Sequence, residues 1–319
     1  MALSDLAVFN DQVHLITTEI IDQQIEKFNR AAQGTLILTP GSNKGDFSEK
    51  AMFKNMGGIV RRRNPYGSGP VEQRSLSHIK DVSVKVAAGT PEIRLDPGQF
   101  KWIKQSPAVA AAAVAKQMAA QKMADHLNTA IGIGVTTIGK STDSTVDVTA
   151  DGGKCTLDNL LVAASKFGDR SQAIRAWVLH SASITNLQRE ALKNAERLFS
   201  FGSVNLMSDG FGRVYIVTDS DNLHWTSSDN KLFYNVLGLT ENAIVVEQND
   251  DFTVAGGDKT GDENIIRTFQ AEWSSNYSVK GYAWAGAKAP TDAALFSAAN
   301  WNRYATSHKD TAGVILKSA

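Results

Sequence analysis

Residues 134–141 read GVTTIGKS and match the phosphate-loop spacing G-x-x-x-x-G-K-[ST], with Gly134, Gly139, Lys140 and Ser141 at the marked positions. In a true phosphate loop, a strand leads into the glycine-rich turn, whose N–H groups surround the phosphates, and a helix begins at the Lys-Ser pair. Here an alanine-rich helical pattern precedes Gly134, and the β-prone segment TDSTVDVTADGG follows Ser141. We therefore interpret the match as a coincidence, with a P-loop nucleotide-binding hydrolase as the alternative function.

The other side chains with catalytic or ligating chemistry are scattered along the chain. The six histidines show no H-x-x-x-H or H-E-x-x-H spacing, and the lone Cys155 allows neither an intrachain disulfide nor a thiolate metal site. His180 stands beside Ser181, but adjacent side chains do not normally face each other, and we expect Ser181 or Ser183 to cap the next helix. We therefore expect no catalytic, cofactor or metal site.

A short basic run lies at Arg61, Arg62 and Arg63, where guanidinium groups could bind phosphate or carboxylate. In a strand, Arg61 and Arg63 would face one way and Arg62 the other, so the three could not form a single grip. Tyr66 is the only nearby aromatic residue, which makes a nucleic-acid site a weak interpretation. We interpret the run as solvated or as forming salt bridges between subunits.

The composition describes a folded, globular chain of 319 residues in which 33 basic side chains balance 33 acidic ones. Such a balance gives no overall attraction to nucleic acid or to an anionic membrane, so any contact with a polyanion must be local. The N-terminus lacks the basic region of a signal peptide. The longest apolar run, 107–115, is far shorter than the about 20 residues needed to span a bilayer. We therefore expect a cytosolic environment and no membrane segment.

The first third of the sequence predicts a helix followed by extended segments. A helical pattern over 10–32 ends before Gly34, and a short strand is expected at 36–38 within an arm that continues to residue 60. Residues 61–98 are rich in Gly and Pro and contain an alternating strand around Val84, so we expect a long two-stranded ribbon. Such a ribbon is marginally stable alone and needs a partner surface.

The rest of the chain predicts a long helix, an α/β unit and a very long strand. The helix begins at Pro107, runs to Ala130, and is expected to stop at Gly132 and Gly134. Alternating short helices and strands follow: a helix capped by Thr156, strands at 173–179 and 212–220, and a helix from about Ser183 with Ile184 and Leu187 inward. The alternation over 269–283 predicts a strand of about 50 Å. We infer one domain built from two distant segments, with the α/β unit inserted between them.

Five stretches occur in order along the chain: FNRAAQGTLIL, GDFSEKAMFKNMGGIVRRRNPYG, VSVKVAAGTPEI, NLLVAASKFGDRSQAIRAWVLHSASITNLQ and PTDAALFSAANWNRYATSHKDTAGVILK. Together with the alanine-rich helix, they resemble the major capsid proteins of tailed bacteriophages with the Hong Kong 97 fold. The resemblance implies an α+β, HK97-like capsid fold. Residues 1–60 would be an N-terminal arm, 61–98 an extended β-ribbon loop, 99–150 with 250–319 a peripheral domain with a long spine helix and long strands, and 151–249 an inserted α/β axial domain.

The same resemblance implies a structural protein and not an enzyme. Its copies would form hexamers and pentamers of an icosahedral shell around double-stranded DNA, located in the virion and assembled in the host cytoplasm. The main partner would be the chain itself, with scaffold, portal and decoration proteins as further candidates. Because the arm helix begins almost at Met1, we expect no N-terminal scaffolding segment. Candidate intersubunit contacts are Arg61, Arg62, Arg63, Tyr66, Lys80 and Lys85.

Overall fold

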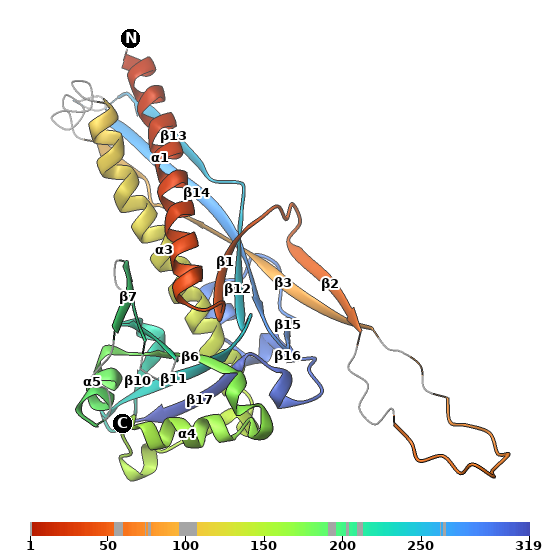
Figure 1. Cartoon of the computed structure of the whole chain (residues 1–319). Helices are drawn as coiled ribbons and strands as arrows, with labels where there is room; N and C mark the ends of the chain where they lie inside the picture. The colour runs from red at the N-terminus through yellow and green to blue at the C-terminus, as the bar shows by residue number, and fades with distance from the viewer. Residues whose placement is uncertain are drawn as a thin grey trace.

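A computed structural model of the chain shows two β-sheets connected by one long helix (Figure 1). The structure describes residues 2–53, 60–73, 75, 78–95, 107–190, 196–201, 204–208, 213–261, 263 and 266–319. Helices and strands are both present but are not regularly alternated over the whole chain, which is the α+β arrangement expected from the sequence. Among the described residues, no helix is both long enough and apolar enough to cross a membrane.

The two long helices, α1 (Ala2–Ala31) and α3 (Pro107–Gly139), lie side by side over one face of the first sheet (Figure 1). The predicted N-terminal helix is confirmed, although it begins well before residue 10. The small alanines of α3 let α1 approach closely, so that Phe9 and Val13 pack on Ala111 and Ala115 and are fully buried.

Helix α3 continues past its expected end, and its 33 residues make it about 50 Å long. The prediction that Gly132 and Gly134 stop the helix is wrong. A Cβ atom at Gly132 would lie 2.4 Å from Cε1 of Phe296, and one at Gly134 would lie 2.7 Å from Cδ1 of Ile244. Close packing against the Phe296 ring therefore favours glycine at 132, whereas at 134 only the flexible end of Ile244 would have to move, and this packing offsets a helix-propensity cost of about 1 kcal/mol per glycine.

The first sheet surrounds the long strand β14 (Ile266–Val279), which pairs with β3, β4, β12 and β13. The predicted strand over 269–283 is interrupted, because a turn with Gly281 at φ +87° leads into β15, and Val279 pairs with Tyr282. Among the described residues this sheet has nine strands. They are β1 (Leu36–Gly41), β2 (Phe47–Phe53), β3 (His78–Gly89), β4 (Ile93–Leu95), β12 (Ile244–Asn249), β13 (Thr253–Lys259), β14, β15 (Tyr282–Trp284) and β16 (Trp301–Arg303).

The ribbon is formed by different strands from those expected. Its second strand, β3, contains the alternation predicted around Val84, but its partner is β2, with Phe47 opposite Val84 and Phe53 opposite His78. The expectation of a two-stranded ribbon confined to residues 61–98 is therefore wrong, because the chain between the two strands includes the arginine run. Residues 47–53 gave little alternation in sequence, since neither face of β2 is fully buried.

The second sheet contains eight strands among the described residues, in the order β5-β17-β11-β6-β9-β8-β7, with β10 paired to β11. The strands predicted at 173–179 and 212–220 are β6 and β9, a parallel pair of buried apolar strands. The full set is β5 (Thr145–Asp147), β6 (Ile174–Leu179), β7 (Glu196–Phe201), β8 (Val204–Ser208), β9 (Val214–Thr218), β10 (His224–Thr226), β11 (Leu232–Thr240) and β17 (Gly313–Ser318).

Sheet membership does not follow the sequence boundaries proposed above. Strand β17 lies inside the second sheet, between β5 and β11, although the sequence grouped residues 250–319 with the long helix. Strand β12, which falls within 151–249, belongs to the first sheet. The chain therefore crosses between the two sheets more often than a single insertion requires.

Two short helices cover the second sheet, and only one has the predicted cap. Helix α4 (Leu157–Ser165) begins as expected, with the Thr156 hydroxyl accepting a hydrogen bond from the Asn159 N–H at 3.2 Å. Helix α5 (Ser181–Glu190) buries Ile184 and Leu187 as predicted. Its first N–H groups are instead bound by neighbours of the expected serines: Asp219 Oδ1 accepts from Ser181 and His180 Nδ1 accepts from Ala182.

Candidate assembly surface

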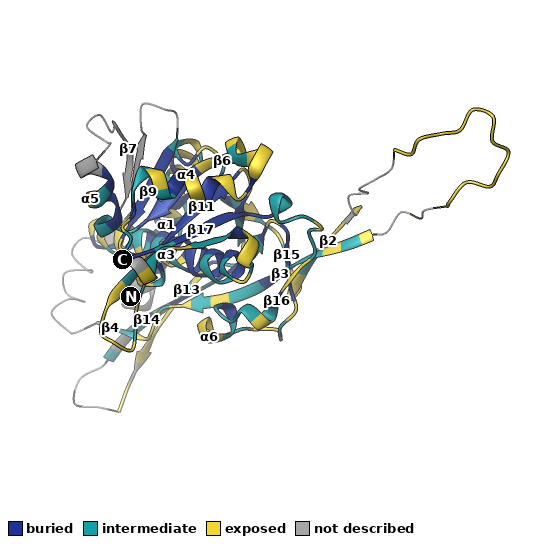
Figure 2. Ribbon diagram, turned by 90° about the horizontal axis from the view of Figure 1, so that it is seen from below, coloured by how far each residue is buried: buried dark blue, intermediate teal, exposed yellow. Residues whose placement is uncertain are grey.

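The ribbon, defined as residues 47–89, extends outward from the first sheet, to which β3 joins it by pairing with β14, and its described outer residues 60–73 are all exposed (Figures 1 and 2). Its outer part contains large apolar side chains that a monomer leaves in water, including Val60, which is 89% exposed, and Tyr66, which is 94% exposed. Large exposed apolar side chains on a protruding element are candidates for contact with another molecule.

Four of the six predicted contact residues lie in this outer part of the ribbon. Arg61, Arg62 and Arg63 are exposed and belong to no strand, so the expected division of their side chains between two strand faces does not apply. Tyr66 follows in a turn, where the Asn64 side chain accepts a hydrogen bond from its N–H at 3.0 Å. The arginine run is thus presented to solvent by irregular backbone.

The other two predicted residues, Lys80 and Lys85, contact acids of their own chain. Lys80 pairs with Glu49 across the ribbon at 2.9 Å, and Lys85 pairs with Asp251 at 3.5 Å. Exposed pairs of this kind contribute about 0–1 kcal/mol. The structure therefore separates the six candidates into two groups. Four of them are exposed residues of the outer ribbon, and the other two, Lys80 and Lys85, form ion pairs within the subunit.

A charged cluster lies where the ribbon leaves the first sheet, and sequence reasoning did not find it. Lys50 of β2 binds Glu247 of β12 at 2.6 Å, and Asp81 of β3 stands opposite Lys50 in the ribbon register. Burial raises the pKa of Asp81 to about 6, while Lys50 acts to lower it and Glu247 to raise it. These residues come from three separate segments, so no sequence spacing relates them.

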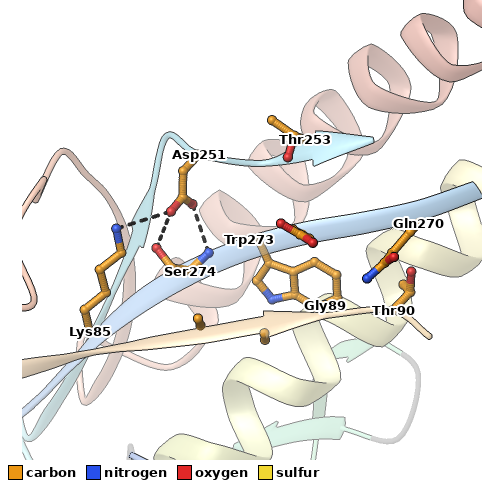
Figure 3. Close-up of a pocket in the computed structure, with 11 residues that line it drawn as sticks. Lys85, Gly89, Thr90, Asp251, Thr253, Gln270, Trp273 and Ser274 are labelled. Atoms are coloured by element: carbon orange, nitrogen blue, oxygen red, sulfur yellow. Dashed lines mark hydrogen bonds and ion pairs between the residues drawn. The ribbon is translucent and has the colours of Figure 1, made fainter. Parts of the chain in front are cut away.

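A polar groove of 740 Å³ runs beside β14, between the end of β3 and the start of β13 (Figure 3). Within it, the carboxylate of Asp251 accepts hydrogen bonds from the N–H of Ser274, at 2.9 Å, and from its hydroxyl, and it faces Lys85. Partial burial opposes ionisation, yet the Ser274 hydrogen bonds and Lys85 together lower the pKa of Asp251. These contacts of Asp251 hold the turn before β13 against β14.

On the opposite face of β14, the buried Lys122 of α3 lies against aromatic rings. Its ammonium is 4.6 Å from the centroid of Phe252 and 5.8 Å from that of Trp273, a cation–π arrangement. Burial lowers the pKa of Lys122 to about 8, and the nearby Asp251 and Asp22 act to raise it. One turn further along α3, burial and Lys122 lower the pKa of His126 to about 3. These groups hold α3 on the sheet.

The segment 134–141, which matched the phosphate-loop spacing, forms the last turns of α3 and the residues just after it. A phosphate loop precedes the N-terminus of a helix, where N–H groups are free to bind anions, whereas this segment ends a helix. Lys140 donates a hydrogen bond to the carbonyl of Trp301 at 2.6 Å. Within the described residues, no group of three or more His, Cys, Asp or Glu side chains is arranged to hold a metal ion.

Solved structures identify the class of fold. The chain matches a structure described as the capsid asymmetric unit of cyanophage Pam1 with a TM-score of 0.50 at 12% identity, covering 87% of this chain and 86% of that chain. It matches the capsid of Ralstonia phage GP4 with the same TM-score of 0.50 at 10% identity, covering 89% and 87%. The fold is the HK97-like fold of phage capsid proteins, as the sequence resemblance implied.

The sequence then places the chain in one family within that class. The model of the Gp13-like family, described as major capsid protein 13-like, matches residues 5–315, and the chain belongs to this family. No curated protein sequence matches the chain. Its role is therefore that of a structural protein of the phage capsid shell, and nothing in the family or the structures supports the nucleotide hydrolase alternative.

Proposed function

We propose that copies of this chain form hexamers and pentamers that close into the icosahedral head of a tailed phage around double-stranded DNA. In this proposal the protein has no catalytic activity, and it assembles in the host cytoplasm. Scaffold, portal and decoration proteins are candidate partners during assembly. The exposed outer ribbon carries the proposal, because residues 60–73 are irregular and exposed, with large apolar side chains such as Val60 and Tyr66 that contact with another molecule would bury.

We assign a different role in assembly to each part of the subunit. In the arm over residues 1–60, helix α1 stiffens the subunit together with α3. The ribbon, whose first strand β2 lies at the end of that arm, reaches a neighbouring subunit, and the second sheet with α4 and α5 lies near the capsomer centre. A protrusion on one side that fits a different surface on the next copy is a head-to-tail contact, which forms a ring where the rotation between copies closes. The contact residues on the ribbon side would be Arg61, Arg62, Arg63 and Tyr66, and Lys80 and Lys85 would hold the ribbon in position.

Electron microscopy of the purified protein tests the proposal, with a ribbon deletion as the critical variant. The wild type should form shells or rings of five or six subunits, alone or with its neighbouring gene products. Deletion of residues 64–78 should leave a folded subunit, judged by circular dichroism and a cooperative urea transition, that no longer assembles. A control with residues 64–73 replaced by Gly and Ser separates the loss of side chains from the loss of length.

Four results would contradict parts of the proposal. Shells formed by the deletion variant would show that the ribbon is not an assembly contact, and loss of the fold would show that the ribbon belongs to the core. A wild type that stays monomeric under every condition would count against self-assembly altogether. Nucleotide hydrolysis abolished by Lys140→Ala would contradict the non-enzymatic part of the proposal.

A further inference from the structure

A second pocket, of 400 Å³, lies where the C-terminal end of α3 meets the second sheet. We call it the Lys140–Lys317 pocket. It is open to solvent and contains two lysines and one amide but no carboxylate among the residues that line it. These residues are Val135, Thr136, Gly139, Lys140, Trp225, Asn235, Phe296, Ala298, Ile315 and Lys317.

The two lysines keep free hydrogen-bonding capacity. Lys140 uses one donor on the carbonyl of Trp301, at 2.6 Å, and an ammonium group has three. Lys317 lies 5.9 Å from the centroid of the Trp225 ring, and its charge is one of the factors that lower the pKa of Asp147. The nearest acid to Lys317 in the sheet is Asp147, whose carboxylate accepts hydrogen bonds from the N–H and hydroxyl of Thr149.

Asn235 of β11 supplies an amide to the same pocket. It is only 7% exposed, and its side chain makes no hydrogen bond with the described part of the chain. The amide nitrogen carries two donors and the amide oxygen accepts, so the side chain can bind a polar group that enters the pocket. The Asn235 side chain lines the pocket, so a group bound there is placed to satisfy it.

The charge of the pocket selects the ligand. Two ammonium groups and an amide donor without a carboxylate favour an anion, and Arg303 adds a third positive charge nearby, with its Nη1 3.4 Å from the Ser141 hydroxyl. An anion with several acceptor oxygens can satisfy lysines and an amide together. We propose that the Lys140–Lys317 pocket binds a phosphate group, held by Lys140, Lys317 and the side-chain amide of Asn235.

Two sources could supply this group: free inorganic phosphate or the backbone of a nucleic acid. If the chain encloses DNA as proposed above, the backbone is the abundant source, and the face that carries this pocket would be the inner face of the shell. The site itself does not depend on assembly, because every residue in it comes from one subunit. Lys140 thus contributes to an anion site through its place in the fold and not through a phosphate loop.

Binding of a short fluorescein-labelled oligothymidine to the unassembled full-length subunit tests the site by fluorescence anisotropy. Substituting both Lys140→Gln and Lys317→Gln should weaken binding about tenfold or more, and each lysine lost should reduce the salt dependence by roughly one phosphate contact. Lys288→Gln, an exposed lysine outside the pocket, is the matched control and should change neither. Lys140→Arg with Lys317→Arg should restore most of the affinity, because both variants keep the charge.

Asn235→Leu distinguishes a ligand contact from a structural one. It should weaken binding while leaving the urea midpoint little changed, since it removes an amide that lines the open pocket and makes no hydrogen bond with the described chain. Inorganic phosphate that displaces the oligonucleotide at millimolar concentration would identify free phosphate as a sufficient ligand, and failure to displace it would identify the nucleic-acid backbone. Equal affinity of the double glutamine variant and the wild type would overturn the proposal, even if shells form normally.

Discussion

The ribbon differs from the rest of the molecule in the contacts that stabilise it. We call the two sheets and their helices, without the ribbon, the body. In the body, Trp177 and Trp301 are fully buried and helix α3 packs through glycines and alanines, so each position is determined by its neighbours. In the ribbon, Tyr66 is almost fully exposed, and the described contacts are strand pairing and surface ion pairs. The body is therefore specified within one subunit, whereas the outer part of the ribbon has little packing within the subunit.

The largest effect expected from this comparison is on stability. Trp177→Ala should lower the free energy of unfolding by about 3–5 kcal/mol, because it leaves a cavity in a core that cannot fully collapse. Tyr66→Ala should change it by no more than about 0.5 kcal/mol, since the side chain is in water. Urea unfolding of the unassembled subunit measures both. A large loss of unfolding free energy in Tyr66→Ala would contradict this difference, because the ribbon would then contribute to the stability of the single subunit.

A smaller effect concerns the glycines of α3. Gly132→Ala should destabilise the subunit by about 1–3 kcal/mol, because the new methyl group overlaps the ring of Phe296. Gly139→Ala, where the nearest atom is 3.8 Å from the new Cβ, should be neutral or stabilising by up to about 1 kcal/mol. Thermal unfolding of the two variants separates packing from propensity. Stabilisation by Gly132→Ala would show that close packing is not what keeps glycine there.

The smallest effect lies at the junction of ribbon and body, where Asp81 titrates. Because burial raises its pKa from 3.8 to about 6, the folded state binds this proton more tightly than the unfolded state. Its contribution to stability is therefore lost as pH rises from about 4 to about 6, and solvent screening limits the loss to about 1–2 kcal/mol. Urea midpoints at pH 4.5 and 7 should differ less in Asp81→Asn than in the wild type. If the two midpoints differ as much in Asp81→Asn as in the wild type, a group other than Asp81 causes the pH dependence.

Local signals in the sequence were sufficient for several elements. Strands β6 and β9 are apolar runs bounded by turns, the Thr156 cap begins α4, and the periodicity around Ile21 and Phe28 predicts α1. The ordered set of short stretches also carried the capsid resemblance, which family and fold confirm. The contact residues proposed on the ribbon stay predictions, because a single subunit contains no neighbour to meet them.

The sequence by itself determined that this is an α+β chain with long helices, a protruding ribbon and no evident catalytic constellation. Only the tertiary structure decided where α3 ends, which strand pairs with β3, and that β17 lies in the second sheet. The physical reason is the same in each case, because surfaces supplied by distant residues decide the outcome. They decide whether a glycine ends a helix or lies within it at a close contact, and which strand pairs with an edge strand. The Lys140–Lys317 pocket likewise exists because the end of α3 meets β11 and β17 in space.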